Sequence, residues 1–118
     1  MRRHHISFKH AWDGIVTAFH TQPNFKVHLF LSFIAVMLGF ILKISSVEWA
    51  VIFFTIGSGL AVELINTAIE FTVDLLTQEY QLLAKFAKDT SAGAMLVYAF
   101  FSVIIAAVIF LPKILVFR

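Results

Sequence analysis

The chain of 118 residues contains no cysteine, and only 14% of its residues are charged. The lack of cysteine excludes disulfides, thiolate metal sites and a cysteine nucleophile. The sequence also has neither a P-loop nor a kinase-type glycine-rich loop, so a nucleotide site in this chain would be of another design. A formal net charge of +2 does not indicate a nucleic-acid-binding surface.

Apolar residues, in contrast, are abundant. Hydrophobic residues make up 60% of the chain and include 14 phenylalanines. This composition is too apolar for a soluble domain and indicates a membrane protein. The length is sufficient for one domain, so we expect a single membrane-embedded domain over residues 1–118.

The pattern of apolar residues predicts an all-α integral membrane protein with four helices. Residues 6–21 separate apolar from polar side chains at helical spacing and follow a basic tail, which indicates an amphipathic helix on the membrane surface. Three longer apolar stretches predict membrane-spanning helices over residues 27–43, 48–76 and 90–111. Pro112 is expected to end the third of these helices.

The basic residues near the spans predict the topology. An N-terminus on the cytoplasmic side places six of them inside, and only three outside. The chain is therefore expected to be a multi-pass protein with a cytoplasmic N-terminus. The inside set is Arg2, Arg3, Lys9, Lys26, Lys85 and Lys88, and the outside set is Lys43, Lys113 and Arg118.

A stripe of polar residues marks the second predicted span. It follows an uncharged run over residues 49–62, and on a helix its members fall within an arc of about 100°. A carboxylate inside a bilayer costs at least a few kcal/mol, so it indicates a functional site. The alternative is the solvated acidic face of an ordinary helix, which the preceding apolar run disfavours. The stripe consists of Glu63, Asn66, Thr67, Glu70 and Asp74.

Carboxylates at helical spacing suit two chemical tasks. One is binding a hard cation such as Mg²⁺, and the other is accepting a proton from an attacking hydroxyl. Phosphoryl transfer uses both, together with a cation such as Lys88 that offsets phosphate charge. The spacing alone therefore indicates a membrane enzyme that uses metal and phosphate, although a small proton-coupled transporter would also carry such carboxylates. The five histidines, including His28, are assigned no role.

The stripe and the segment after it closely resemble the signature of a known family. Glu63-x-x-Asn66-Thr67-Ala68-Ile69-Glu70-x-x-Val73-Asp74 is followed by Ala87-Lys88-Asp89, a pattern similar to that of the small prokaryotic diacylglycerol kinases, which include undecaprenol kinases. Ala11-Trp12-x-Gly14-Ile15 also fits, so the resemblance covers essentially the whole chain. It implies a homotrimeric helical bundle in the bacterial inner membrane that transfers the γ-phosphate of ATP, with Mg²⁺, to a lipid alcohol.

The resemblance also implies roles for individual residues. Glu63 matches the general base near the lipid hydroxyl, and Glu70 matches a metal-binding carboxylate. The family's second metal-binding carboxylate falls at Gln22, which can offer a carbonyl oxygen but no negative charge. The residues expected to bind the nucleotide are Asn66, Asp74, Glu79, Lys88 and Asp89.

Two features bear on the activity and the substrate. Gln22 leaves open an alternative, a catalytically weakened or non-catalytic lipid-binding protein of the same fold. Thr67 and the segment Leu83-Ala84-Lys85 look more like the undecaprenol kinase branch. We therefore expect undecaprenol as the preferred substrate, with diacylglycerol as the other candidate.

Overall fold

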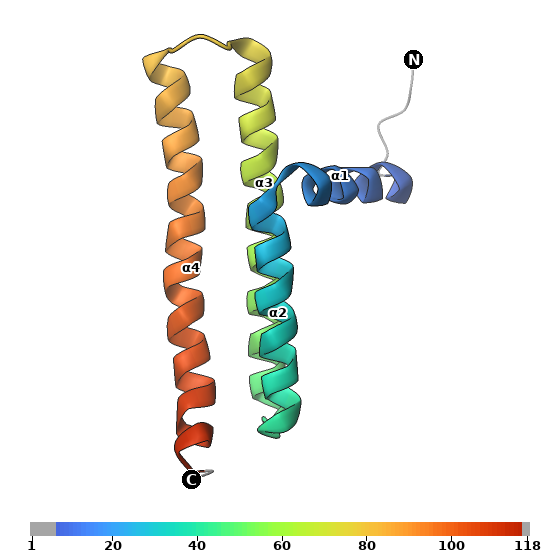
Figure 1. The fold of residues 1–118 in the computed structure, drawn as a ribbon, viewed down its shortest axis with the longest axis vertical. Coiled ribbons are helices and arrows are strands. Elements are labelled where there is room, and N and C mark those ends of the chain that lie inside the picture. Colours follow the sequence, from blue (N-terminus) through green and yellow to red (C-terminus); the bar gives the residue numbers. More distant parts are fainter. Residues whose placement is uncertain (1–6, 117–118) are drawn as a thin grey trace.

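The structure, a computed structural model, describes residues 7–116, and within that range it contains α-helices and no strand. The helices α2, α3 and α4 run side by side along the long axis of the molecule, and α1 projects across their direction (Figure 1). This arrangement confirms an all-helical protein with a short helix ahead of three long ones. The bounds are α1 (Phe8–Thr21), α2 (Pro23–Ile41), α3 (Ser46–Leu76) and α4 (Leu82–Val116).

The three long helices are each long and apolar enough to cross a membrane. With 31 and 35 residues, α3 and α4 are about 46 and 52 Å long, whereas the hydrocarbon core of a bilayer is about 30 Å thick. The hairpin where α3 passes into α4 extends beyond the level of α1 (Figure 1). A helix lying on the membrane surface at that level would leave the hairpin, with its charged residues, in water.

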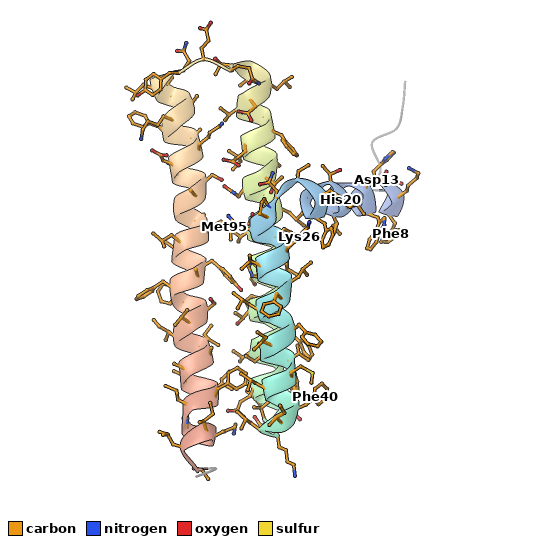
Figure 2. The ribbon with its side chains drawn as sticks, in the orientation of Figure 1. Phe8, Asp13, His20, Lys26, Phe40 and Met95 are labelled. Carbon is orange, nitrogen blue, oxygen red and sulfur yellow. The ribbon has the colours of Figure 1, made fainter. Side chains whose placement is uncertain are left out.

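The helix α1 has the amphipathic character that the sequence predicts. Phe8 and Trp12 are 90% and 64% exposed, whereas Lys9 pairs with Asp13 at 3.0 Å on the helix surface. Figure 2 shows Phe8 and Asp13 on different sides of the helix. Exposed aromatic rings beside charged residues suit the boundary between lipid and water. Ile6, the first residue of the predicted surface helix, lies outside the described residues.

The helix ends follow from local chemistry. Pro23 stands at the first position of α2, where a backbone N–H has no helical partner in any case, so proline is tolerated there. α2 therefore begins at Pro23, before residue 27, the predicted start of the first span. At the start of α3, the Ser45 hydroxyl accepts a hydrogen bond from the Glu48 N–H, and the Glu48 carboxylate accepts one from the Ser45 N–H. This reciprocal cap begins α3 at Ser46 and fixes the turn after α2.

The prediction that Pro112 ends the last helix is wrong. Pro112 lies inside α4, which continues to Val116. A proline removes only one helical hydrogen bond, and the contacts around it hold the helix together. Phe110 is buried just before it, and the Lys113 ammonium lies 3.1 Å from the Glu48 carboxylate at the start of α3. α4 also begins at Leu82, before the predicted span.

The apolar core and the buried polar residues occupy different parts of the bundle. The core lies near the turn between α2 and α3 and consists of Leu42, Ile44, Ile52, Ile109 and Phe110. Nearer the hairpin, the buried residues that α3 and α4 contribute are polar: Glu63, Thr67 and Ser91. Apolar packing therefore holds one end of the helices together, while the other end presents polar groups.

Gly59 allows a close approach between the three long helices, whereas Gly57 does not. A Cβ at Gly59 would collide with the side chains of Tyr98 and His28, but a Cβ at Gly57 would have no neighbour within 4 Å. We therefore expect Gly59→Ala to be less stable than Gly57→Ala by about 1–3 kcal/mol. Thermal unfolding of both variants in detergent checks this, and equal midpoints would contradict the close contact.

Candidate active site

The polar stripe of α3 lies on one helical face that turns toward α4. Asn66 is half-buried, and its side-chain oxygen accepts a hydrogen bond from the Ser91 hydroxyl of α4. Two turns further along, the Asp74 carboxylate accepts a hydrogen bond from the Lys88 ammonium at 2.7 Å. The two contacts join α3 to α4 along the stripe. They align the stripe with the segment that carries Lys88 and Asp89.

Glu63 is the most unusual residue of the stripe. Its side chain is only 2% exposed, and within residues 7–116 no group donates a hydrogen bond to its carboxylate. No fully buried side-chain oxygen or nitrogen among the described residues lacks a partner, so the Glu63 carboxylate keeps a narrow access to the space beside it. A carboxylate in a largely apolar site with no protein donor is still costly to hold in its charged form. A side chain held in this state is ready to accept a proton or a hydrogen bond from a bound molecule.

The Glu63 side chain lines a cavity of about 660 Å³ between α2, α3 and α4, which we call the interhelical cavity. This volume is in the usual range of small-molecule sites, about 300–1,000 Å³. Its walls are mainly apolar, and several lining residues, such as Leu31 and Leu96, are also largely exposed, so the cavity opens on the surface that faces the bilayer. Met95, another lining residue, lies at the height of Lys26, just below α1 (Figure 2).

The polar residues that line this cavity lie at two levels. Asn24, Glu63 and Asn66 lie at the level near α1, where the membrane surface is expected. His28, Thr55 and Tyr98 lie deeper, on the side of the apolar core. A molecule with one polar end and a hydrocarbon body could enter with its polar end at Glu63.

A second pocket of about 340 Å³ lies at the hairpin between α3 and α4, and we call it the hairpin pocket. Four of the residues that the sequence predicts as nucleotide-binding line it together, since residues 77–81 bring the ends of both helices side by side. The Asp74–Lys88 pair bridges the helices, while Lys85 pairs with Asp89 one turn away on α4. The four residues are Asp74, Glu79, Lys88 and Asp89.

The two residues expected to bind metal line neither cavity. Gln22 lies where α1 passes into α2, and its side-chain amide donates only a long hydrogen bond of 3.4 Å to the Thr21 hydroxyl. Glu70 is half-buried on the stripe between Asn66 and Asp74. In the described part of the chain, no three acidic or histidine side chains cluster in a way that could hold a metal ion. Mg²⁺ usually takes only one or two carboxylates and completes its shell with water and substrate phosphates, so a cluster of three such side chains is not required for the Mg²⁺ that the sequence predicts at Glu70 and Gln22.

Sequence reasoning did not find three residues that the structure brings to the site: His28, Tyr98 and Ser91. The signal for His28 was present, because a histidine inside an apolar span needs a polar partner. Its partner is Tyr98, 70 residues away, with 3.4 Å between the imidazole Nε2 and the phenolic oxygen. Ser91, in turn, orients Asn66. Such long-range pairs leave no periodic pattern in the sequence.

Comparison with known proteins identifies the family of the chain. The profile described as "Prokaryotic diacylglycerol kinase" matches residues 9–110. The protein named undecaprenol kinase of Bacillus subtilis is 45% identical over 113 residues, which are 96% of this chain and 92% of that protein. Diacylglycerol kinases of Synechocystis sp. and Pseudomonas aeruginosa are 40% and 34% identical, over 93% and 71% of this chain and 63% and 68% of their own lengths. The chain therefore belongs to the prokaryotic diacylglycerol kinase family.

Proposed function

We propose that this protein transfers the γ-phosphate of ATP to the hydroxyl of a membrane polyprenol, with Glu63 as the general base. The observation that carries this proposal is the buried Glu63 carboxylate, which has no donor among the described residues and lines an otherwise apolar cavity. The family is one of lipid kinases. The preference for a polyprenol is supported by the relative at 45% identity, which is named undecaprenol kinase.

The two cavities suit the two substrates. Asp74 in the hairpin pocket is 11 residues from Glu63 on α3, a distance of about 16 Å along the helix. ATP bound in the hairpin pocket would direct its phosphates along the stripe, where Lys88 offsets their charge and Asn66 donates from its amide. The lipid would place its hydroxyl at Glu63 and its chain in the interhelical cavity.

The proposed reaction is a single displacement. Glu63 accepts the hydroxyl proton while the lipid oxygen forms a bond to the γ-phosphorus. The bond between the γ-phosphorus and the bridging oxygen breaks, and ADP leaves with the electron pair. Glu70 and the carbonyl oxygen of Gln22 would hold Mg²⁺, which supplies positive charge that neutralises the phosphates.

The proposed working form is a homotrimer in the bacterial inner membrane, with the N-terminus and the hairpin on the cytoplasmic side, where ATP is present. Three observations support this form. Lys and Arg residues near the spans are more numerous on the proposed inner side. The long helices leave many large apolar side chains exposed, which suits contact with lipid and with neighbouring subunits. Glu70 and Gln22 line neither cavity of one subunit, so a neighbouring subunit would complete the metal site.

Transfer of labelled γ-phosphate tests the proposed function. The full chain is incubated in mixed micelles with Mg²⁺ and ATP, with undecaprenol and diacylglycerol offered separately. We expect the label mainly on undecaprenol. Label on diacylglycerol alone would support the proposed phosphoryl transfer but overturn the proposed lipid preference. No label on either lipid would favour a non-catalytic lipid-binding protein of the same fold.

A further inference from the structure

The deep wall of the interhelical cavity has no free hydrogen-bond donor among its described hydroxyl groups. The Ser32 hydroxyl donates to the His28 carbonyl at 2.8 Å, and the Thr55 hydroxyl donates to the Val51 carbonyl at 2.7 Å. The Ser102 hydroxyl is also bonded within its own helix, to the Ala99 carbonyl. These polar residues therefore present carbon rather than donors to a bound molecule.

His28, Tyr98 and Thr55 form a chain of hydrogen bonds, and its donors are also used within the protein. The Tyr98 hydroxyl of α4 donates to the Thr55 carbonyl of α3 at 2.6 Å. A phenol has a single proton, so the 3.4 Å contact between Tyr98 and the Nε2 of His28 requires the imidazole to donate. The rings of His28 and Tyr98 lie 5.3 Å apart and tilted by 32°. Both available protons are used within the protein.

The His28–Tyr98 pair lies about one helical turn from Glu63, the proposed base, on the side of the apolar core. The His28 and Tyr98 side chains meet over Gly59, because a Cβ there would collide with both. Gly59 is four residues from Glu63 on α3, which corresponds to about 6 Å along the helix toward the apolar core. A lipid with its hydroxyl at Glu63 would place the next few atoms of its chain against the His28–Tyr98 pair.

The two candidate lipids differ in these few atoms. A diacylglycerol carries ester carbonyl oxygens close to its hydroxyl, whereas a polyprenol continues as hydrocarbon. A buried carbonyl that finds no donor lowers binding by roughly five- to 150-fold. A wall without donors therefore disfavours the diacylglycerol and accepts the polyprenol. The side-chain amides of Asn24 and Asn66, which donate to no group in residues 7–116, lie at the level of the hydroxyl, where both lipids are alike.

We propose that the hydrogen-bonded residues His28, Tyr98 and Thr55, which leave no donor free, determine the lipid preference. They select alcohols that continue as pure hydrocarbon next to the hydroxyl over alcohols that carry esters there. This inference rests on the proposed kinase function and assigns its lipid preference to particular residues. Tyr98 and His28 are specificity-determining residues that act on the bound chain, and they take no part in the proton transfer.

Tyr98→Phe tests the proposal because it frees the His28 N–H to face the cavity. The Thr55 carbonyl keeps its helical N–H partner, so the helix is unaffected. We expect the ratio of kcat/KM for diacylglycerol to that for undecaprenol to rise by at least five-fold. The double variant His28→Leu with Tyr98→Phe removes the freed donor, and we expect its ratio to return to within about two-fold of the starting value.

Each outcome decides the proposal. A raised ratio in Tyr98→Phe that returns in the double variant supports it. An unchanged ratio in Tyr98→Phe, with undecaprenol still phosphorylated, overturns this inference and leaves the proposed function intact. The same result is expected if a second copy of the protein, rather than the lipid, fills the cavity. A preference of the unmodified protein for diacylglycerol overturns the inference as well. A starting protein that phosphorylates neither lipid overturns both. Thermal unfolding of each variant shows that the comparison is made on folded protein.

Discussion

Glu63→Gln is expected to lower lipid phosphorylation by about 10²–10⁴-fold while ATP binding stays unchanged. The amide has nearly the size of the carboxylate but cannot accept the hydroxyl proton, and a general base contributes an effect of this size. The hairpin pocket, where ATP is proposed to bind, does not include Glu63. Turnover measured with labelled ATP, alongside the affinity for a non-hydrolysable ATP analogue, separates the two effects.

Stability provides a second measurement for the same variant. The Glu63 carboxylate faces a mainly apolar cavity and has no donor among the described residues, so removing its charge relieves part of the cost of desolvation. We expect Glu63→Gln to unfold at the same temperature as the unmodified chain or at a higher one. Residues kept for activity at a cost in stability behave in this way. A lower unfolding temperature together with lost activity would instead indicate a structural role for Glu63.

Glu48→Gln is the matched control, since it makes the same change in the first turn of α3. Glu48 caps the start of the helix and pairs with Lys113, and it lines neither cavity. We expect this variant to keep its turnover. Activity of Glu63→Gln within a few-fold of the unmodified chain would show that another group accepts the proton.

Lys88→Met is expected to raise the KM for ATP by roughly 10- to 100-fold. Lys88 lines the hairpin pocket, and its ammonium bridges α4 to Asp74 on α3. It also lies within the electrostatic reach of Glu70. A bound triphosphate would need this positive charge to offset its own, and methionine keeps the length of the side chain without the charge. Initial rates over a range of ATP concentrations measure the effect.

Lys9→Met is the control for the loss of one lysine charge. Lys9 lies on α1, pairs with Asp13 at the surface and lines neither cavity. We expect its KM for ATP to remain unchanged. An unchanged KM for ATP in Lys88→Met would argue that Lys88 serves only to join α3 to α4, and a lower unfolding temperature of that variant would then accompany it.

Much of the fold could be predicted from periodicity and composition. The long apolar runs allow only helices in a membrane, because every backbone polar group must be satisfied within the segment. The stripe from Glu63 to Asp74 was predictable for the same reason, since helical spacing places its members on one face. The structure confirms these helices and brings four of the predicted nucleotide-binding residues into the hairpin pocket.

The end of α4 and the deep wall of the cavity could not be predicted in this way. Pro112 is a helix-ending signal in the sequence, but the Lys113–Glu48 pair and the burial of Phe110 hold the helix beyond it. His28 had no assigned role, because its partner Tyr98 is 70 residues distant. The Pro112 error and the missed His28–Tyr98 contact both concern packing between helices, which local sequence patterns do not encode.

The sequence by itself determined the helices, their apolar character and the polar stripe on α3, because these depend on spacing within one segment. Only the tertiary structure decided that Glu63 is buried without a donor while Asp74 is paired with Lys88, although both lie on the same stripe. The tertiary structure also decided that the His28 imidazole contacts the Tyr98 hydroxyl and that this hydroxyl donates to the Thr55 carbonyl. The physical reason is that burial and hydrogen-bond partners come from packing between α2, α3 and α4.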